Sequence, residues 1–220
     1  MAGTLGIDDD TYIPEKSLII IPRIIVHTPS PTCSMATSTY PTTQYTSEEF
    51  VESSGAILFD LSSYPETKTN RVCLIHHLAK DEWLLAKGRR NCGESRREAA
   101  LREVQEETGY RCHTHPVTMA TRAPGMAEAQ DVSDRARVYA DVEEPFMLTI
   151  RDNSSGGEKL NAKLIWWFIS AVDERQEVDR PVAEGGFRAE FFAWEDALRK
   201  LTFQNDRNVL ERAISLVGNS

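Results

Sequence analysis

Apolar and polar positions follow regular patterns over most of the chain from residue 48 onward. Short apolar runs bounded by turn-forming residues predict strands, and apolar residues three and four apart predict helices. Strands are expected in the segments 53–61, 71–78, 82–88, 110–122, 145–152, 163–173 and 188–194. Helices are expected over 194–201 and 206–217, the second with an apolar stripe formed by Leu210, Ala213, Ile214 and Val217.

Two pairs of these strands are expected to form hairpins. The first pair flanks the turn region 62–70, and the second flanks a connection that contains Gly156 and Gly157. The polar segment 122–141 is expected to be a loop that covers the substrate, a partly helical insertion or a plain surface excursion. Strands combined with helices in this order predict the α/β class, with a mixed sheet and helices on both faces.

The N-terminal part of the chain follows a different pattern. Segment 18–26 is apolar but is interrupted by a Pro-Arg pair, and segment 28–47 is dense in Ser, Thr and Pro. This composition predicts a flexible linker. We therefore expect a disordered or loosely attached tail over residues 1–47 and a folded domain over residues 48–220. The apolar segment either lies on the domain or binds a partner.

Composition narrows the class of protein. The chain has 220 residues, of which 40% are hydrophobic and 27% charged, which is ordinary for a globular domain. A net charge of −9 argues against a nucleic-acid partner. The four cysteines show no paired spacing and no secretory signal is visible, so a cytoplasmic location is expected, with the nucleus as an open alternative. No apolar stretch is long enough to cross a bilayer, so no membrane partner is expected.

A 23-residue run that starts at Gly88 carries the candidate chemistry, and it reads GRRNCGESRREAALREVQEETGY. Ser95 followed by Glu98 is the pattern of a capping box, in which each residue satisfies a backbone N–H of the other. Residues 96–108 contain no Gly or Pro and are rich in helix formers. Gly109 supplies a left-handed C-cap. The run therefore predicts a helix of roughly three to four turns.

Three carboxylates share one face of this predicted helix. Glu103, Glu106 and Glu107 lie three and four positions apart, where side chains are neighbours and like charges destabilise the helix. A bound divalent cation removes this cost, and hard oxygen ligands suit Mg²⁺ or Mn²⁺. A solvated acidic face paired with nearby arginines is the simpler interpretation. The loop glycine, the upstream Glu94 and the terminal glycine, all in register with the carboxylates, favour the metal site.

The run closely resembles the signature sequence of the Nudix hydrolases: Gly, five residues, Glu, seven residues, then Arg-Glu-Val-x-Glu-Glu-x-Gly. Tyr110 departs mildly from the aliphatic residue usual at the last position. The resemblance implies an α/β/α sandwich with a mixed sheet and a catalytic loop-helix-loop. It also implies metal-dependent cleavage of a phosphoanhydride bond. A catalytically silent nucleotide-binding module is the alternative, but such relatives typically lose a metal-binding glutamate, and all three are present here.

The resemblance also assigns roles to individual residues. It assigns metal coordination to Glu103, Glu106, Glu107 and the backbone carbonyl of Lys87. Arg102 is expected to pair with a carboxylate of the run and hold it in place. Gly88 lets the backbone approach the ion and the phosphates. A carboxylate outside the run is expected to act as general base, with Glu184 as the first candidate and Glu190 as the second. The implied mechanism is metal-assisted attack of water on phosphorus.

The substrate is expected to carry several phosphates. The candidate substrate-binding residues are Lys87, Gly88, Arg89 and Arg90. A local basic cluster in an acidic protein suits a polyphosphorylated small molecule, although these charges could also balance the acidic helix. The Lys-Gly pair resembles the Pro-Lys-Gly sequence of the diadenosine polyphosphate and diphosphoinositol polyphosphate hydrolases, with Ala86 in place of Pro. These two substrate classes are expected, with ADP-ribose, other nucleoside diphosphate compounds and capped RNA as alternatives. Base-stacking candidates are Trp166, Trp167, Phe191 and Phe192, of which any one is more often a core residue.

Overall fold

The computed structural model describes residues 39–61, 70–125, 128, 131–152, 162–173 and 186–219. Contacts between Cα positions divide the chain into two units, Met1–Thr43 and Gln44–Ser220. Every described helix and strand belongs to the second unit. The apolar segment 18–26 and the Gly-Gly connection predicted from the sequence lie outside the described residues. The tail over residues 1–47 stays a prediction.

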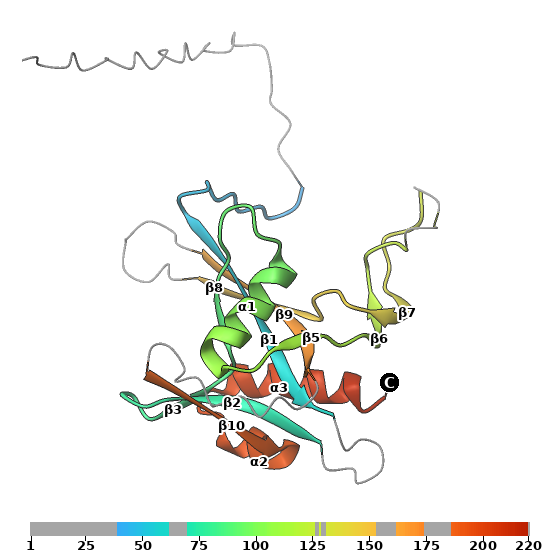
Figure 1. The fold of residues 1–220 in the computed structure, drawn as a ribbon. Helices are drawn as coiled ribbons and strands as arrows, with labels where there is room; N and C mark the ends of the chain where they lie inside the picture. Colours follow the sequence, from blue (N-terminus) through green and yellow to red (C-terminus); the bar gives the residue numbers. More distant parts are fainter. Residues whose placement is uncertain are drawn as a thin grey trace, which may run out of the picture. The chain divides into compact units, whose positions relative to one another are not determined.

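The second unit contains ten strands and three helices within the described residues (Figure 1). The strands are β1 (Phe50–Asp60), β2 (Arg71–His77), β3 (Glu82–Leu84), β4 (Lys87–Arg89), β5 (Cys112–Thr114), β6 (Val117–Thr121), β7 (Arg137–Val142), β8 (Met147–Asp152), β9 (Ala162–Val172) and β10 (Phe187–Ala193). The helices are α1 (Arg96–Thr108), α2 (Trp194–Lys200) and α3 (Gln204–Val217).

The long strand β1 lies at the centre of a mixed sheet. The sheet order is β10-β2-β1-β9-β5, with β3 attached to β2, β4 to β1 and β8 to β9. β1 runs parallel to β9, whereas its pairings with β2 and β4 are antiparallel. The two predicted hairpins are confirmed as the antiparallel pairs β1–β2 and β8–β9.

Alternate side chains of β1 face two different helical layers. Ala56 and Leu58 belong to a buried cluster that includes Ala100 and Val104 of α1. Ile57 and Phe59 belong to a second cluster that includes side chains of α2 and α3. Because successive residues of a strand point to opposite sides, the sheet lies between the helices as an α/β/α sandwich, as predicted (Figure 1). We call the two sides of the sheet the α1 face and the α3 face.

Three segments differ from the sequence-based expectation. Segment 82–88 forms two short strands, because β3 pairs with β2 and β4 pairs with β1. Segment 110–122 is also divided, since β5 joins the main sheet and β6 forms a separate two-stranded sheet with β7. β7 arises within the polar segment 122–141, where no strand was predicted. Its side chains are all at least partly exposed, including Val138 at 69%, although Val138, Ala140 and Val142 do alternate with more polar residues in the sequence.

Candidate active site

Helix α1 is fixed at both ends by its own sequence. The hydroxyl of Ser95 accepts the backbone N–H of Glu98 at 3.2 Å, and the Glu98 carboxylate accepts the backbone N–H of Ser95 at 2.8 Å. Gly109 adopts φ 77° and donates its N–H to the carbonyl of Gln105. The predicted capping box and left-handed C-cap are therefore confirmed. Ala100 and Val104 are buried against the sheet, so the orientation of the carboxylate face is set by packing.

The carboxylate of Glu103 rests against the backbone of Gly88 in β4. A Cβ atom added to Gly88 would lie 1.9 to 2.3 Å from the carboxyl atoms of Glu103. Any other residue would therefore displace this carboxylate. Glycine permits the close approach that the sequence suggested, and in this structure the group that approaches is the side chain of Glu103.

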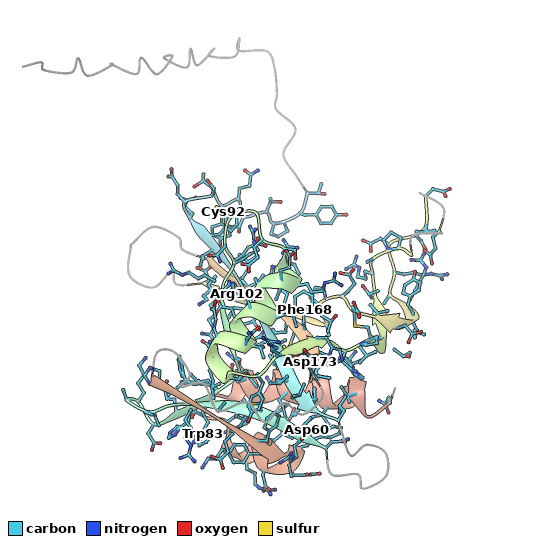
Figure 2. The ribbon with its side chains drawn as sticks, viewed as in Figure 1. Asp60, Trp83, Cys92, Arg102, Phe168 and Asp173 are labelled. Carbon is cyan, nitrogen blue, oxygen red and sulfur yellow. The ribbon has the colours of Figure 1, made fainter. Side chains whose placement is uncertain are left out.

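Arg102 of α1, which is labelled in Figure 2, bonds to the loop residue Glu94 and to two of the three candidate metal ligands. Its Nε and Nη2 groups donate to the carboxylate of Glu94 at 2.7 and 3.0 Å. Its Nη1 group donates to Glu103 at 2.8 Å and to Glu106 at 2.9 Å. A further bond runs from Nη2 to the carbonyl of Arg89 at 3.0 Å. The hydrogen bond from Arg102 holds the pKa of Glu94 below its ordinary value, and Glu94 in turn raises the pKa of Arg102.

Glu107 occupies a largely enclosed position. Its carboxylate accepts the backbone N–H of Lys87 at 2.8 Å. Burial raises the pKa of Glu107 to about 7, although this hydrogen bond and the charge of Lys87 act in the opposite direction. A buried carboxylate with so little compensating charge is the kind of group that a bound cation stabilises in its ionised form.

The three glutamates lie on one helix end but do not meet at a single point. Among the described residues, no three His, Cys, Asp or Glu side chains are close enough together to hold a metal ion. Glu103 and Glu106 share the Nη1 group of Arg102, while Glu107 is bonded to β4. The oxygen donors fit a hard divalent cation in chemistry.

A second ionic network, centred on Glu52 of β1, has no counterpart in the sequence analysis. The Glu52 carboxylate accepts Arg90 Nε at 3.0 Å, Arg96 Nη2 at 2.6 Å and Trp166 Nε1 at 3.1 Å. The Arg96 guanidinium also lies 4.1 Å from the centre of the Trp166 ring. Burial raises the pKa of Glu52, but the hydrogen bonds from Arg96 and Trp166 outweigh it, so the net pKa lies below the ordinary value. No local signal could identify Glu52, because Arg96 follows 44 residues later.

This network occupies residues that the sequence offered for substrate binding. Arg90 pairs with Glu52, and Trp166 is covered by Arg96. Trp167 is only 1% exposed and belongs to the core.

The remaining predicted residues lie on β4, on β10 or outside the described residues. Lys87 and Arg89 alternate with Gly88 along the strand, so their side chains leave toward the α3 face. Glu184 lies outside the described residues. Glu190 is exposed on β10, which pairs with β2 and not with β4.

Comparisons with known proteins bear on the family. The model of the NUDIX domain matches residues 64–213. Ap4A hydrolase from C. elegans matches with 14% identity and a TM-score of 0.47, over 76% of this chain and 97% of that chain. The NUDIX domain of Shewanella oneidensis NrtR, solved with ADP ribose, matches with 14% identity and a TM-score of 0.48, over 78% and 92%. The E. coli dihydroneopterin triphosphate pyrophosphohydrolase matches with 15% identity and a TM-score of 0.43, over 77% and 96%. No curated protein matches the sequence.

None of the described helices combines the length and the apolar character that a membrane span requires.

The family model covers more than half of the chain, and it includes the whole signature run. In the structure, Glu103 of that run contacts both Gly88 and Arg102. The chain belongs to the Nudix family and is a Nudix-type pyrophosphohydrolase.

Proposed function

We propose that this protein uses Mg²⁺ or Mn²⁺ to hydrolyse a phosphoanhydride bond in a polyphosphorylated small molecule, a diphosphoinositol polyphosphate or a dinucleoside polyphosphate. The observation that supports it most directly is the contact of α1 with β4. Arg102 holds Glu103 and Glu106 there, and Glu107 is bonded to the backbone of the same strand. Three carboxylates on one helix face repel one another, and a binding module without turnover would gain nothing from keeping all three.

Nudix enzymes generally use divalent metal cations, and the present donor set fits such a group. Glu103, Glu106 and Glu107 would hold it, and Glu106 is accessible because its side chain is 45% exposed. When bound, the cations supply polarisation of the anhydride and neutralise charge on the leaving phosphate. Arg102 orients two of the carboxylates. The role of general base is proposed for Glu184.

The chain itself supplies two elements for substrate positioning. Gly88 keeps the backbone of β4 free of a side chain on the side of the carboxylates. Lys87 and Arg89, on either side of it, place positive charge at the same strand, where a substrate with several phosphates can be held. This charge favours polyphosphorylated substrates over ADP-ribose.

The experiment is a comparison of wild type with Glu106→Gln on a panel of phosphoanhydride substrates, with phosphate release measured in Mg²⁺ and in Mn²⁺. The Gln side chain keeps the shape but removes a charged ligand, so turnover should fall at least about a hundredfold. Thermal stability should be retained, because carboxylate repulsion is relieved. Glu211→Gln, on the exposed side of α3, removes the same charge and should leave turnover unchanged. Near-full activity of Glu106→Gln, or a wild type inactive on the whole panel, contradicts the proposal.

A further inference from the structure

Four basic side chains lie on the α3 face, two on β4 and two on the strands beyond β1. We call them the cation cluster, and its members are Lys87 and Arg89 from β4, Arg151 from β8 and Lys163 from β9. A Cβ atom added to Gly55 of β1 would lie 2.7 Å from the Cβ of Lys87 and 2.8 Å from the ring of Trp167, which belongs to the core on the α3 face. Lys87 therefore leaves the sheet on this face.

The strand register places the other three on the same side. Arg89 follows Lys87 by two residues, so it lies on the same face of the sheet as Lys87. Lys163 precedes Trp167 by four residues, so it lies on the same face as Trp167. Arg151 is the direct partner of Lys163 in the β8–β9 pairing. The cluster thus gathers residues that are far apart in the sequence onto one face of the sheet, with β1 between β4 and β9.

The four positive charges of the cluster have one buried carboxylate next to them, Asp206, whose pKa is affected by Lys87 and Arg151. Lys87, Arg89 and Lys163 form no ion pair with any residue that the structure describes, and Arg151 lies 4.0 Å from Asp206. Burial lowers the pKa of Lys163, and the neighbouring charges of Lys87, Arg151 and Arg89 lower it further. Four positive charges held this close repel one another, and an anion with several charges removes that cost.

The cluster is also close to the carboxylates of the active site. The charge of Glu103 reaches Lys163 and partly offsets the lowering of its pKa. β4 pairs with β1, and side chains of α1 bond to its backbone, Glu107 to the Lys87 N–H and Arg102 to the Arg89 carbonyl. A substrate with its scissile bond near Glu103 therefore reaches Lys163 and Arg151 across β1, which lies between β4 and β9.

We propose that the cation cluster binds substrate phosphates remote from the scissile bond and so selects densely phosphorylated substrates, with Arg151 and Lys163 as specificity residues. The inference rests on the proposed function and deepens it. The shared chemistry is a dense array of phosphates, which either a phosphorylated inositol ring or a linear polyphosphate chain can present.

The kinetic test uses Arg151→Gln/Lys163→Gln. Its substrates are diphosphoinositol pentakisphosphate, diadenosine tetraphosphate and ADP-ribose. For whichever of the first two substrates the wild type prefers, KM should rise by roughly tenfold or more, with kcat changed less than about threefold. The reason is that the lost contacts bind the ground state and the transition state equally. ADP-ribose turnover should change less than about threefold. The first two substrates distinguish a ring of phosphates from a linear chain.

The charge-matched control is Arg97→Gln/Arg199→Gln. These two arginines pair with Glu143 and Asp196 at exposed positions of α1 and α2. The control variant should behave as wild type on all three substrates. An equal loss on all substrates, or an unchanged ratio of kcat/KM between the dense substrates and ADP-ribose, overturns the inference.

Direct binding separates this inference from the proposed function. Calorimetry with inorganic tripolyphosphate in the absence of divalent metal should show binding to wild type and to Glu106→Gln. The affinity of Arg151→Gln/Lys163→Gln should be roughly tenfold weaker. Equal affinities overturn the cluster as a phosphate site even if the enzyme is active. Weakened binding supports it even if no tested substrate is hydrolysed.

Discussion

The two faces of β4 use positive charge in opposite ways. On the α1 face, three arginines are paired with carboxylates that are 12 to 14% exposed; they are Arg90, Arg96 and Arg102. On the α3 face, Lys87, Arg89 and Lys163 have no such partners among the described residues. The strand that separates them is three residues long. A paired cation stabilises the shape of the loop, whereas an unpaired one retains its attraction for an anionic substrate.

Pairing also explains why a high density of arginine does not by itself identify a phosphate site. Arg102 makes five hydrogen bonds to protein groups around the loop. A guanidinium with its donors engaged in this way positions other groups, because few directions remain for a ligand. We therefore expect mutations on the α1 face to affect geometry and stability, and mutations on the α3 face to affect KM.

The largest effect is expected at Gly88, where the α1 face meets β4. In Gly88→Ala the new methyl group would overlap the carboxyl group of Glu103, which is the end of a flexible side chain and can turn away. The fold should survive with a small change in Tm. Turnover should fall by about a hundredfold, as expected when a metal ligand is misplaced. Wild-type turnover in this variant would show that Glu103 does not need its present position.

Gly55→Ala provides the contrasting result on the α3 face of β1. Its added methyl group would lie 2.4 Å from the carbonyl oxygen of Ala86, a backbone atom that cannot turn aside. Stability should therefore fall by about 1–3 kcal/mol or more, the usual cost of overpacking. Chemical denaturation of both variants measures the difference. Equal loss of stability in the two would contradict the distinction between the faces.

The sequence predicts the α1 side of this comparison well because its determinants are local. The capping box, the C-cap glycine and the carboxylate spacing all lie within one 23-residue run. Hydrogen bonds between Ser95 and Glu98 span three residues, so a local pattern is sufficient to recognise them. The strands of the sheet were also recognisable, because buried strands are apolar over several residues.

The α3 side and the Glu52 network could not be predicted because they depend on strand register. Lys163 joins Arg89 only because β9 and β4 both pair with β1. Glu52 meets Arg90 by the same pairing, across 38 residues of sequence. Arg90 consequently looks like a free substrate-binding residue in the sequence, and the structure shows it paired.

A smaller effect is expected when the Glu52 network is broken by Glu52→Gln. Loss of the charge weakens hydrogen bonds from two arginines, which should cost about 1–3 kcal/mol of stability at pH 7. The folded pKa of Glu52 lies below its ordinary value of 4.5. Its contribution is therefore present above that value and is lost as the pH falls through the folded pKa.

The difference in unfolding free energy between wild type and Glu52→Gln should consequently shrink between pH 7 and pH 3. Urea denaturation at the two pH values measures it. Glu211→Gln serves again as the control, with no pH-dependent difference expected. A constant difference would show that the cost comes from packing and not from charge.

The smallest effect is expected at Asp206, whose carboxylate lies 4.0 Å from Arg151. Asp206 is 2% exposed, and burial raises its pKa, although Lys87, Arg151 and a hydrogen bond from the Leu85 N–H act in the opposite direction. A raised folded pKa means that its favourable contribution is complete below the ordinary value of 3.8 and is lost as the pH rises through the folded pKa.

Asp206→Asn keeps an oxygen for the Leu85 N–H but carries no charge at any pH. It should therefore gain about 1 kcal/mol or less relative to wild type at pH 7, and this gain should disappear near pH 3. Removing a negative charge beside the cation cluster should also strengthen tripolyphosphate binding by about two- to fivefold. Thermal denaturation at both pH values and calorimetry measure the two effects. Weaker anion binding would instead indicate that Asp206 orients Arg151 for its ligand, and that the cluster is a paired site after all.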